Sequence, residues 1–147
     1  MSRFRSILAL VLVAMTVFLV SCGGAPVAKG PLYSEAQLEQ IQTYAAGVNS
    51  LRDRFLELPP LVQKGDWTEV DSFLHGDLGE LRARMARLAR SLAPKDTQTA
   101  ALDAAKEVFV HLNEMDEAVQ TREVTKALKN YNAALKDFDA FLEFIPS

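Results

Sequence analysis

The sequence contains one cysteine, Cys22, and the residues before it indicate what chemistry its thiol undergoes. Leu19-Val20-Ser21 places aliphatic and small side chains directly ahead of this cysteine, which is typical of a lipobox. In that motif the thiol becomes a thioether carrying diacylglycerol, and the new N-terminus usually gains a further acyl chain. We therefore expect Cys22 to be lipidated, and two or more acyl chains to hold the protein stably on a membrane surface.

The segment that precedes Cys22 has the features of a secretory signal peptide. Arg3 and Arg5 form a positively charged start, and the 14-residue run 7–20 is uncharged. A membrane-spanning helix needs about 20 apolar residues, so an uncleaved anchor fits this run less well. We predict a signal peptide over residues 1–21, removed by cleavage. Its loss removes two arginines and no acidic residue, so the formal net charge would change from −3 to −5.

The two histidines are weak candidates for zinc ligands. A zinc site needs several converging ligands, and only scattered carboxylates accompany His75 and His111 along the sequence. Glu107 or Glu114 could pair with His111 at helical spacing and bind zinc adventitiously. Because the chain has a single cysteine, an intramolecular disulfide and a cysteine-based metal site are both excluded. We favour solvated or structural histidines and predict no metal site.

Other cofactors and catalytic motifs fit the sequence poorly. A haem held by His111 and either Met85 or Met115 is disfavoured, because methionine is more often a core residue and Met115 would share a helix with His111. A di-iron bundle needs a glutamate three positions before a histidine on two helices, and neither histidine has one. The GxSxG, HExxH, phosphate-loop and GxGxxG motifs do not occur. We predict a protein that is not an enzyme and that holds no cofactor.

Four arginines form the most informative charge feature. They are spaced along the polar half of one predicted helix, and no acidic residue occurs between positions 81 and 95. Guanidinium groups suit carboxylate pairing at interfaces, so this half of the helix is a candidate partner-docking face, although a merely solvated face fits equally well. The acidic net charge argues against nucleic-acid binding. The candidate docking residues are Arg82, Arg84, Arg87 and Arg90.

Helical periodicity predicts the elements that must position these side chains. Four amphipathic helices with short connections can bury their apolar faces only against one another. This predicts an all-α fold, an up-down four-helix bundle, over residues 34–147. Residues 22–33 are rich in glycine and proline and should form a flexible, lipidated tether between the membrane and the bundle.

Capping residues and prolines predict the ends of the first two helices. Ser34 and Gln37 match a capping box, and Pro59-Pro60 should end or sharply bend the first helix before a connector over residues 61–65. Asp66 should cap the second helical stretch, with Glu69 at the capping-box position. A break is expected at His75-Gly76, and Asp77 could cap the continuation.

The second half of the chain is more regular. Pro94 should stop the second helix, Asp96 should cap the third, and residues 120–123 should form a loop before a fourth helix that ends at Pro146. Apolar residues at alternating spacings of three and four predict the buried seams. These are Leu78, Leu81, Met85, Leu88 and Leu92 in the second helix, and Leu128, Tyr131, Leu135, Phe138, Leu142 and Ile145 in the fourth.

Several strings in this chain resemble the PsbQ family of extrinsic photosystem II subunits, in its cyanobacterial lipoprotein form. The resemblance covers the whole chain. One of the strings that carry it is HGDLGELR at residues 75–82, and its best single marker is the His-Gly-x-Leu-Gly string at residues 75–79. Asp77 departs from related sequences, which often have proline after His-Gly, so the local turn is expected to differ. The other matching positions are Trp67 and residues 92–96, 106–112 and 137–142.

The resemblance implies a four-helix bundle tethered in the thylakoid lumen and docked on the lumenal face of photosystem II. It implies a non-catalytic role that stabilises the water-oxidising assembly beside PsbO and the inner antenna protein, and that supports calcium and chloride retention. Plant members have a longer proline-rich N-terminus and no lipobox, so their ion-retention behaviour transfers weakly. The alternative is a helical-bundle lipoprotein that carries a metal or haem, which the almost wholly apolar seams disfavour.

Overall fold

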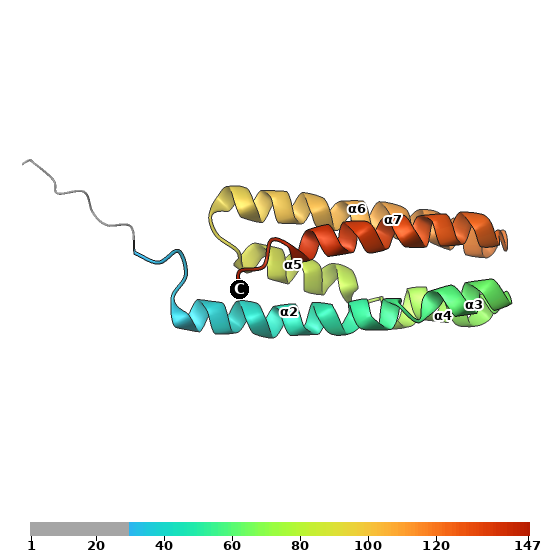
Figure 1. Cartoon of the computed structure of the whole chain (residues 1–147), viewed down its shortest axis with the longest axis horizontal. Helices are drawn as coiled ribbons and strands as arrows, with labels where there is room; N and C mark the ends of the chain where they lie inside the picture. The colour runs from blue at the N-terminus through green and yellow to red at the C-terminus, as the bar shows by residue number, and fades with distance from the viewer. Residues whose placement is uncertain (1–29) are drawn as a thin grey trace, which may run out of the picture. The chain divides into compact units, whose positions relative to one another are not determined.

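The computed structural model describes residues 30–147; the expected signal peptide, Cys22 and most of the tether lie outside the described residues. Residues 32–147 form one compact unit, and no strand occurs among the residues described. Its helices form four rods, each running antiparallel to the one before it (Figure 1). The predicted all-α, up-down four-helix bundle is therefore confirmed. The rods are α2 (Glu35–Phe55) with α3 (Leu58–Lys64); α4 (Trp67–Ser72), η1 (Phe73–Asp77) and α5 (Leu81–Ser91); α6 (Lys95–Gln120); and α7 (Val124–Leu142).

The first rod begins with the predicted capping box. The Ser34 hydroxyl oxygen accepts a hydrogen bond from the Gln37 backbone N–H at 3.3 Å, and the Gln37 side-chain oxygen accepts one from the Ser34 N–H at 2.9 Å. Two backbone donors that the helix cannot satisfy itself are thereby paired. Tyr33 fixes the same end, because its hydroxyl donates to the Ala93 carbonyl at 2.7 Å and accepts from the Ala93 N–H at 2.8 Å.

The double proline begins a helix, and the prediction of a connector over residues 61–65 was wrong. Leu58–Lys64 is the helix α3, with Pro59 and Pro60 in its first turn. A missing N–H costs nothing there, because the first backbone donors of a helix have no partner within it. Gly65 then reverses the chain in a left-handed conformation, with φ at 73°. The first rod is consequently longer than its first helix.

The second rod breaks where the sequence predicts, at His75-Gly76. These residues belong to the π-helical turn η1, and Leu78–Glu80 form a turn before α5. Asp77 does not cap α5, because its carboxylate binds the Arg54 guanidinium through two hydrogen bonds of 2.8 and 2.6 Å. Asp66 does occupy the N-cap position of α4, but its side chain makes no capping hydrogen bond, so the box with Glu69 is not formed.

Two boundaries in the second half of the chain also differ from the prediction. Pro94, rather than Asp96, occupies the N-cap position of α6, and Asp96 lies within the first turn. The helix α7 ends at Leu142 and not at Pro146, whose carbonyl accepts a hydrogen bond of 2.7 Å from the Gln42 side chain. The predicted loop is confirmed, since residues 121–123 separate α6 from α7.

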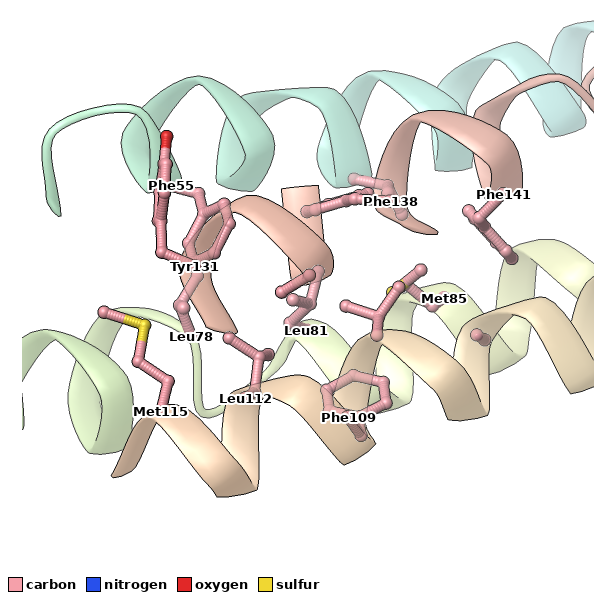
Figure 2. Close-up of a cluster of buried hydrophobic side chains, with 14 of the residues drawn as sticks. Phe55, Leu78, Leu81, Met85, Phe109, Leu112, Met115, Tyr131, Phe138 and Phe141 are labelled. Atoms are coloured by element: carbon pink, nitrogen blue, oxygen red, sulfur yellow. The ribbon is translucent and has the colours of Figure 1, made fainter. Parts of the chain in front are cut away.

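The core lies along the axis of the bundle and is almost entirely apolar. Phe55 of α2 packs against two α7 rings, with centroid distances of 4.7 Å to Tyr131 and 6.5 Å to Phe138. Figure 2 shows these rings in one cluster with side chains from α5 and α6. The predicted α5 seam is confirmed, since Leu78, Leu81, Met85, Leu88 and Leu92 are all buried. The predicted seam of the fourth helix was wrong at four positions, because Leu128, Leu135 and Leu142 of α7, and Ile145 beyond its end, are only partly buried. The buried line in α7 is Ala127, Tyr131, Ala134, Phe138 and Phe141.

Among residues 30–147, no helix combines the length and the apolarity that crossing a bilayer requires.

Candidate functional site

The most distinctive surface feature is a groove between α2 and α5. A pocket of about 240 Å³ is lined by Thr43, Tyr44 and Gly47 of α2 and by Arg84 and Arg87 of α5. The helix α5 has no acidic residue of its own, and Glu80, which directly precedes it, pairs with Arg84 and not with Arg87. The groove therefore presents two guanidinium groups, which are donors suited to an oxyanion.

The other two arginines lie outside this groove. The Arg82 guanidinium carbon lies 4.0 Å from the ring centroid of Phe109 on α6, a cation–π contact. Arg82 also lines a smaller, largely apolar pocket between α5 and α6. Arg90 is exposed near the end of α5, where its carbonyl accepts a hydrogen bond from the Gln98 side chain at 2.8 Å. The four candidate docking residues thus occupy two borders of α5 and its outer face, rather than a single patch.

One of these four arginines has an ion-pair partner within the described part of the chain. Arg84 pairs with Glu80 one turn earlier, through Nε at 3.0 Å and Nη2 at 2.7 Å to the same carboxylate oxygen. Both side chains of this pair are largely exposed, so the pair contributes about 0–1 kcal/mol to stability. No ion pair within residues 30–147 involves Arg82, Arg87 or Arg90. Three guanidinium groups thus remain available to a partner.

The first candidate zinc ligand, His75, lies in a small acidic cluster. Its Nε2 is 3.1 Å from Asp116 of α6 and 3.6 Å from Asp71 of α4, and these three ligand atoms lie within 4.8 Å of one another. The Asp71–His75 spacing of four residues is visible in the sequence, but Asp116 comes from another helix. Sequence reasoning missed this trio because the fold alone brings α6 beside η1.

The second candidate, His111, lies elsewhere on the bundle. Its Nδ1 is 3.4 Å from Glu114 and its Nε2 is 3.4 Å from Asp137 of α7. Glu107, the other suggested partner, forms no ion pair with it among the residues described. Both ring nitrogens face carboxylates at the surface, whereas Met85 and Met115 are fully buried. The geometry does not provide the facing pair of axial ligands that a haem requires.

The described titratable groups with perturbed pKa values are structural. The hydrogen bond from Arg52 to Asp139, 2.6 Å long, raises the pKa of the Arg52 guanidinium and ties α2 to α7. Burial raises the pKa of the Tyr131 hydroxyl, and the nearby Arg52 charge partly opposes that rise. Neither group lies in the groove or in the histidine clusters. The perturbed groups therefore give no indication of an acid–base centre.

These features define a class of protein: a helical bundle with an apolar core whose charged groups are arranged on its surface. The family model for PsbQ, described as oxygen evolving enhancer protein 3, matches residues 2–146. The chain belongs to the PsbQ family, whose members are extrinsic subunits of photosystem II. It is also similar to CyanoQ of Synechocystis sp. PCC 6803, with 42% identity over 147 residues that cover 99% of this chain and 98% of that protein.

Proposed function

We propose that this chain is a non-catalytic, lipid-anchored subunit on the lumenal side of photosystem II. The observation that carries the proposal is the family match over residues 2–146. The apolar core supports it further, because the buried side chains of residues 30–147 offer no cluster of polar ligands for a resident cofactor. The bundle acts by binding to a larger assembly, and the chemistry belongs to that assembly.

The anchor in this proposal is the lipid on Cys22, together with the tether over residues 22–33. The lipobox and the uncharged run before it support lipidation. Replacing Cys22 with serine should prevent thioether formation and move the protein from the membrane fraction to the soluble fraction after cell breakage. Metabolic labelling with a radioactive fatty acid should mark the wild-type chain and leave the variant unmarked. A labelled variant, or a membrane-bound one, would contradict the proposed anchor.

The docking residues in this proposal are Arg82, Arg84, Arg87 and Arg90. Their positive charge on an acidic protein supports binding to acidic groups of a partner. Reversal of Arg84 and Arg87 to glutamate should release the protein from photosystem II without unfolding it, because both side chains are exposed. The experiment is an affinity pull-down of a tagged chain from detergent-solubilised thylakoids, with thermal melting as the folding control. Undiminished recovery of photosystem II subunits by the reversed variant would refute the proposal that these arginines form the docking face.

The partners in this proposal are PsbO and the inner antenna protein, and the consequence of docking is retention of calcium and chloride at the water-oxidising centre. Family membership supports both statements. Cells that lack this chain should lose oxygen evolution sooner than wild-type cells when calcium and chloride are depleted from the medium. Crosslinking in wild-type membranes should yield products that contain PsbO or the antenna protein. Equal tolerance of ion depletion in both strains would refute the retention role.

Metal carriage is the second candidate function, and one observation favours it. Asp71, His75 and Asp116 bring three ligand atoms within 4.8 Å of one another, and carboxylates with an imidazole can hold zinc. Against this, the side chain of His75 is 61% exposed, and a carrier would be expected to enclose its cargo. Metal analysis of the purified chain decides between the two. Stoichiometric zinc that is lost on His75→Ala, with no photosystem II subunits in the pull-down, would favour the carrier.

A further inference from the structure

We propose that the groove between α2 and α5 is a receptor for one carboxylate side chain of the partner protein, held by the guanidinium groups of Arg84 and Arg87. This inference rests on the proposed docking function and refines it. It assigns specific recognition to two of the four arginines and only general electrostatic attraction to Arg82 and Arg90. It also assigns a role to Gly47, which the sequence pattern alone does not suggest.

The receptor depends on close approach of Arg84 to the backbone of α2. A Cβ atom built on Gly47 would lie 2.8 Å from Nη1 of Arg84, shorter than any ordinary contact. The glycine therefore leaves the space in which the guanidinium lies against the neighbouring helix. Glycine in a helix interior costs about 0.5–1 kcal/mol relative to alanine, so its position here is consistent with a packing requirement.

The groove offers donors that the protein itself does not use. Arg84 directs Nε and Nη2 to Glu80, which leaves Nη1 beside Gly47 for a ligand. Arg87 has no ion pair within the described residues, and its guanidinium carbon lies 5.8 Å from the centroid of the Tyr44 ring. The Tyr44 hydroxyl accepts a hydrogen bond from Gln40 at 3.0 Å and retains its own proton to donate. An entering carboxylate can therefore accept from two guanidinium groups and one hydroxyl.

The shape of the site favours a single carboxylate over an extended anionic surface. A membrane rich in anionic lipid would attract exposed cations additively, so Arg82 and Arg90 would count as much as Arg84 and Arg87. The groove instead gathers two guanidinium groups around a pocket of about 240 Å³, whose walls belong to two different helices. Planar guanidinium groups bind carboxylates through paired hydrogen bonds, which a lysine ammonium cannot reproduce. The occupant that fits is an aspartate or glutamate side chain of the docked subunit.

The test uses substitutions that keep the charge and remove the guanidinium geometry. Arg84→Lys with Arg87→Lys should weaken binding to detergent-solubilised photosystem II, purified from a strain that lacks this chain, by roughly tenfold or more. The matched control is Arg54→Lys with Arg122→Lys, which removes the same number of exposed guanidinium groups at positions outside the proposed docking residues. We expect this control to bind within about threefold of wild type, since exposed charges act mainly through general attraction.

Gly47→Ala supplies a second test in which no charge changes. The added methyl group should displace the Arg84 guanidinium and weaken binding in the same direction as the lysine variants. The displaced atom is the end of a flexible side chain, so we expect the variant to remain folded. Thermal melting of each variant alone checks this. A folded Gly47→Ala variant that binds as tightly as wild type would overturn the receptor.

The outcomes separate this inference from the docking proposal on which it rests. Normal binding by the glutamate reversal of Arg84 and Arg87 would overturn both. Loss of binding by that reversal, with normal binding by the lysine pair, would leave the docking face in place and overturn the carboxylate receptor. Binding of the protein to vesicles of phosphatidylglycerol is the third measurement. If the lysine pair weakens binding to these vesicles as strongly as it weakens binding to photosystem II, that result would assign the groove to lipid and overturn the carboxylate receptor.

Discussion

A Cβ atom placed on Gly79 would lie 2.9 Å from the carbonyl oxygen of His75, so the turn between η1 and α5 closes too tightly for any side chain there. The obstructing atom belongs to the backbone, which cannot move aside without distorting the π-helical turn. Gly79→Ala should therefore lower the free energy of unfolding by about 1–3 kcal/mol. Urea unfolding of the purified bundle measures this loss.

Gly76 is the matched control for that substitution. It lies in η1, three residues before Gly79, and nothing lies within 4 Å of the position that its Cβ would take. Gly76→Ala should leave stability unchanged or raise it by about 0.4–1 kcal/mol, because alanine restricts the unfolded chain. Equal destabilisation by the two alanines would mean that close packing at Gly79 is not what shapes this turn.

The Arg54–Asp77 pair joins the end of α2 to η1 and replaces the cap that the sequence predicts for Asp77. Its two hydrogen bonds are short, but the side chains are 46% and 37% exposed. Solvent screening therefore limits their coupling to about 1 kcal/mol or less. A double-mutant cycle with Arg54→Gln and Asp77→Asn measures this coupling directly. The coupling energy should shrink further in about 1 M salt, because dissolved ions screen exposed charges. A coupling energy that salt leaves unchanged would show that solvent screening does not limit this pair.

The periodic parts of the fold could be predicted from the sequence. Leu81, Met85 and Leu88 alternate at spacings of three and four, and such spacing leaves one face of a helix for burial. The α7 seam shows the limit of that reasoning. Ala127 and Ala134 are fully buried, whereas the larger Leu128 is only partly buried. Small residues allow close helix approach, and a search for large apolar residues overlooks them.

The local breaks and the surface groove depend on information that periodicity does not contain. Proline is compatible with both the end and the first turn of a helix, so Pro59-Pro60 alone could not decide between them. The arginine groove needs Gly47 from another helix, and the acidic cluster at His75 needs Asp116 from α6. Both arise only when the rods pack. The sequence predicts the arginines and histidines as candidates, but not which of them lie together.

Phe138 lies at the centre of the bundle, 1% exposed and 6.5 Å from the Phe55 ring. Phe138→Ala should lower the free energy of unfolding by about 3–5 kcal/mol, because it removes buried surface and leaves a cavity. Val110→Ala is the control, since Val110 is an apolar residue that is 45% exposed. That control should change stability by about 0.5 kcal/mol or less. Chemical denaturation measures both, and a loss below about 1 kcal/mol for Phe138→Ala would mean that the core is less tightly packed than described.

The hydroxyl of Tyr131 should make the bundle sensitive to alkaline pH. Burial raises the pKa of this group above its ordinary value of 10.0. In the unfolded chain the phenol ionises near its ordinary value, whereas in the folded chain it resists ionisation until a higher pH. The stability linked to Tyr131 is therefore fully present below about pH 10 and is lost as the pH rises through the folded pKa.

Urea unfolding across that interval tests the linkage. Tyr131→Phe keeps the ring that packs on Phe55 and removes the ionisable hydroxyl, so its stability should fall less steeply above about pH 10 than that of wild type. The comparison with wild type cancels the titration of the lysines common to both proteins. Identical alkaline slopes for wild type and Tyr131→Phe would show that burial of this hydroxyl does not couple folding to pH.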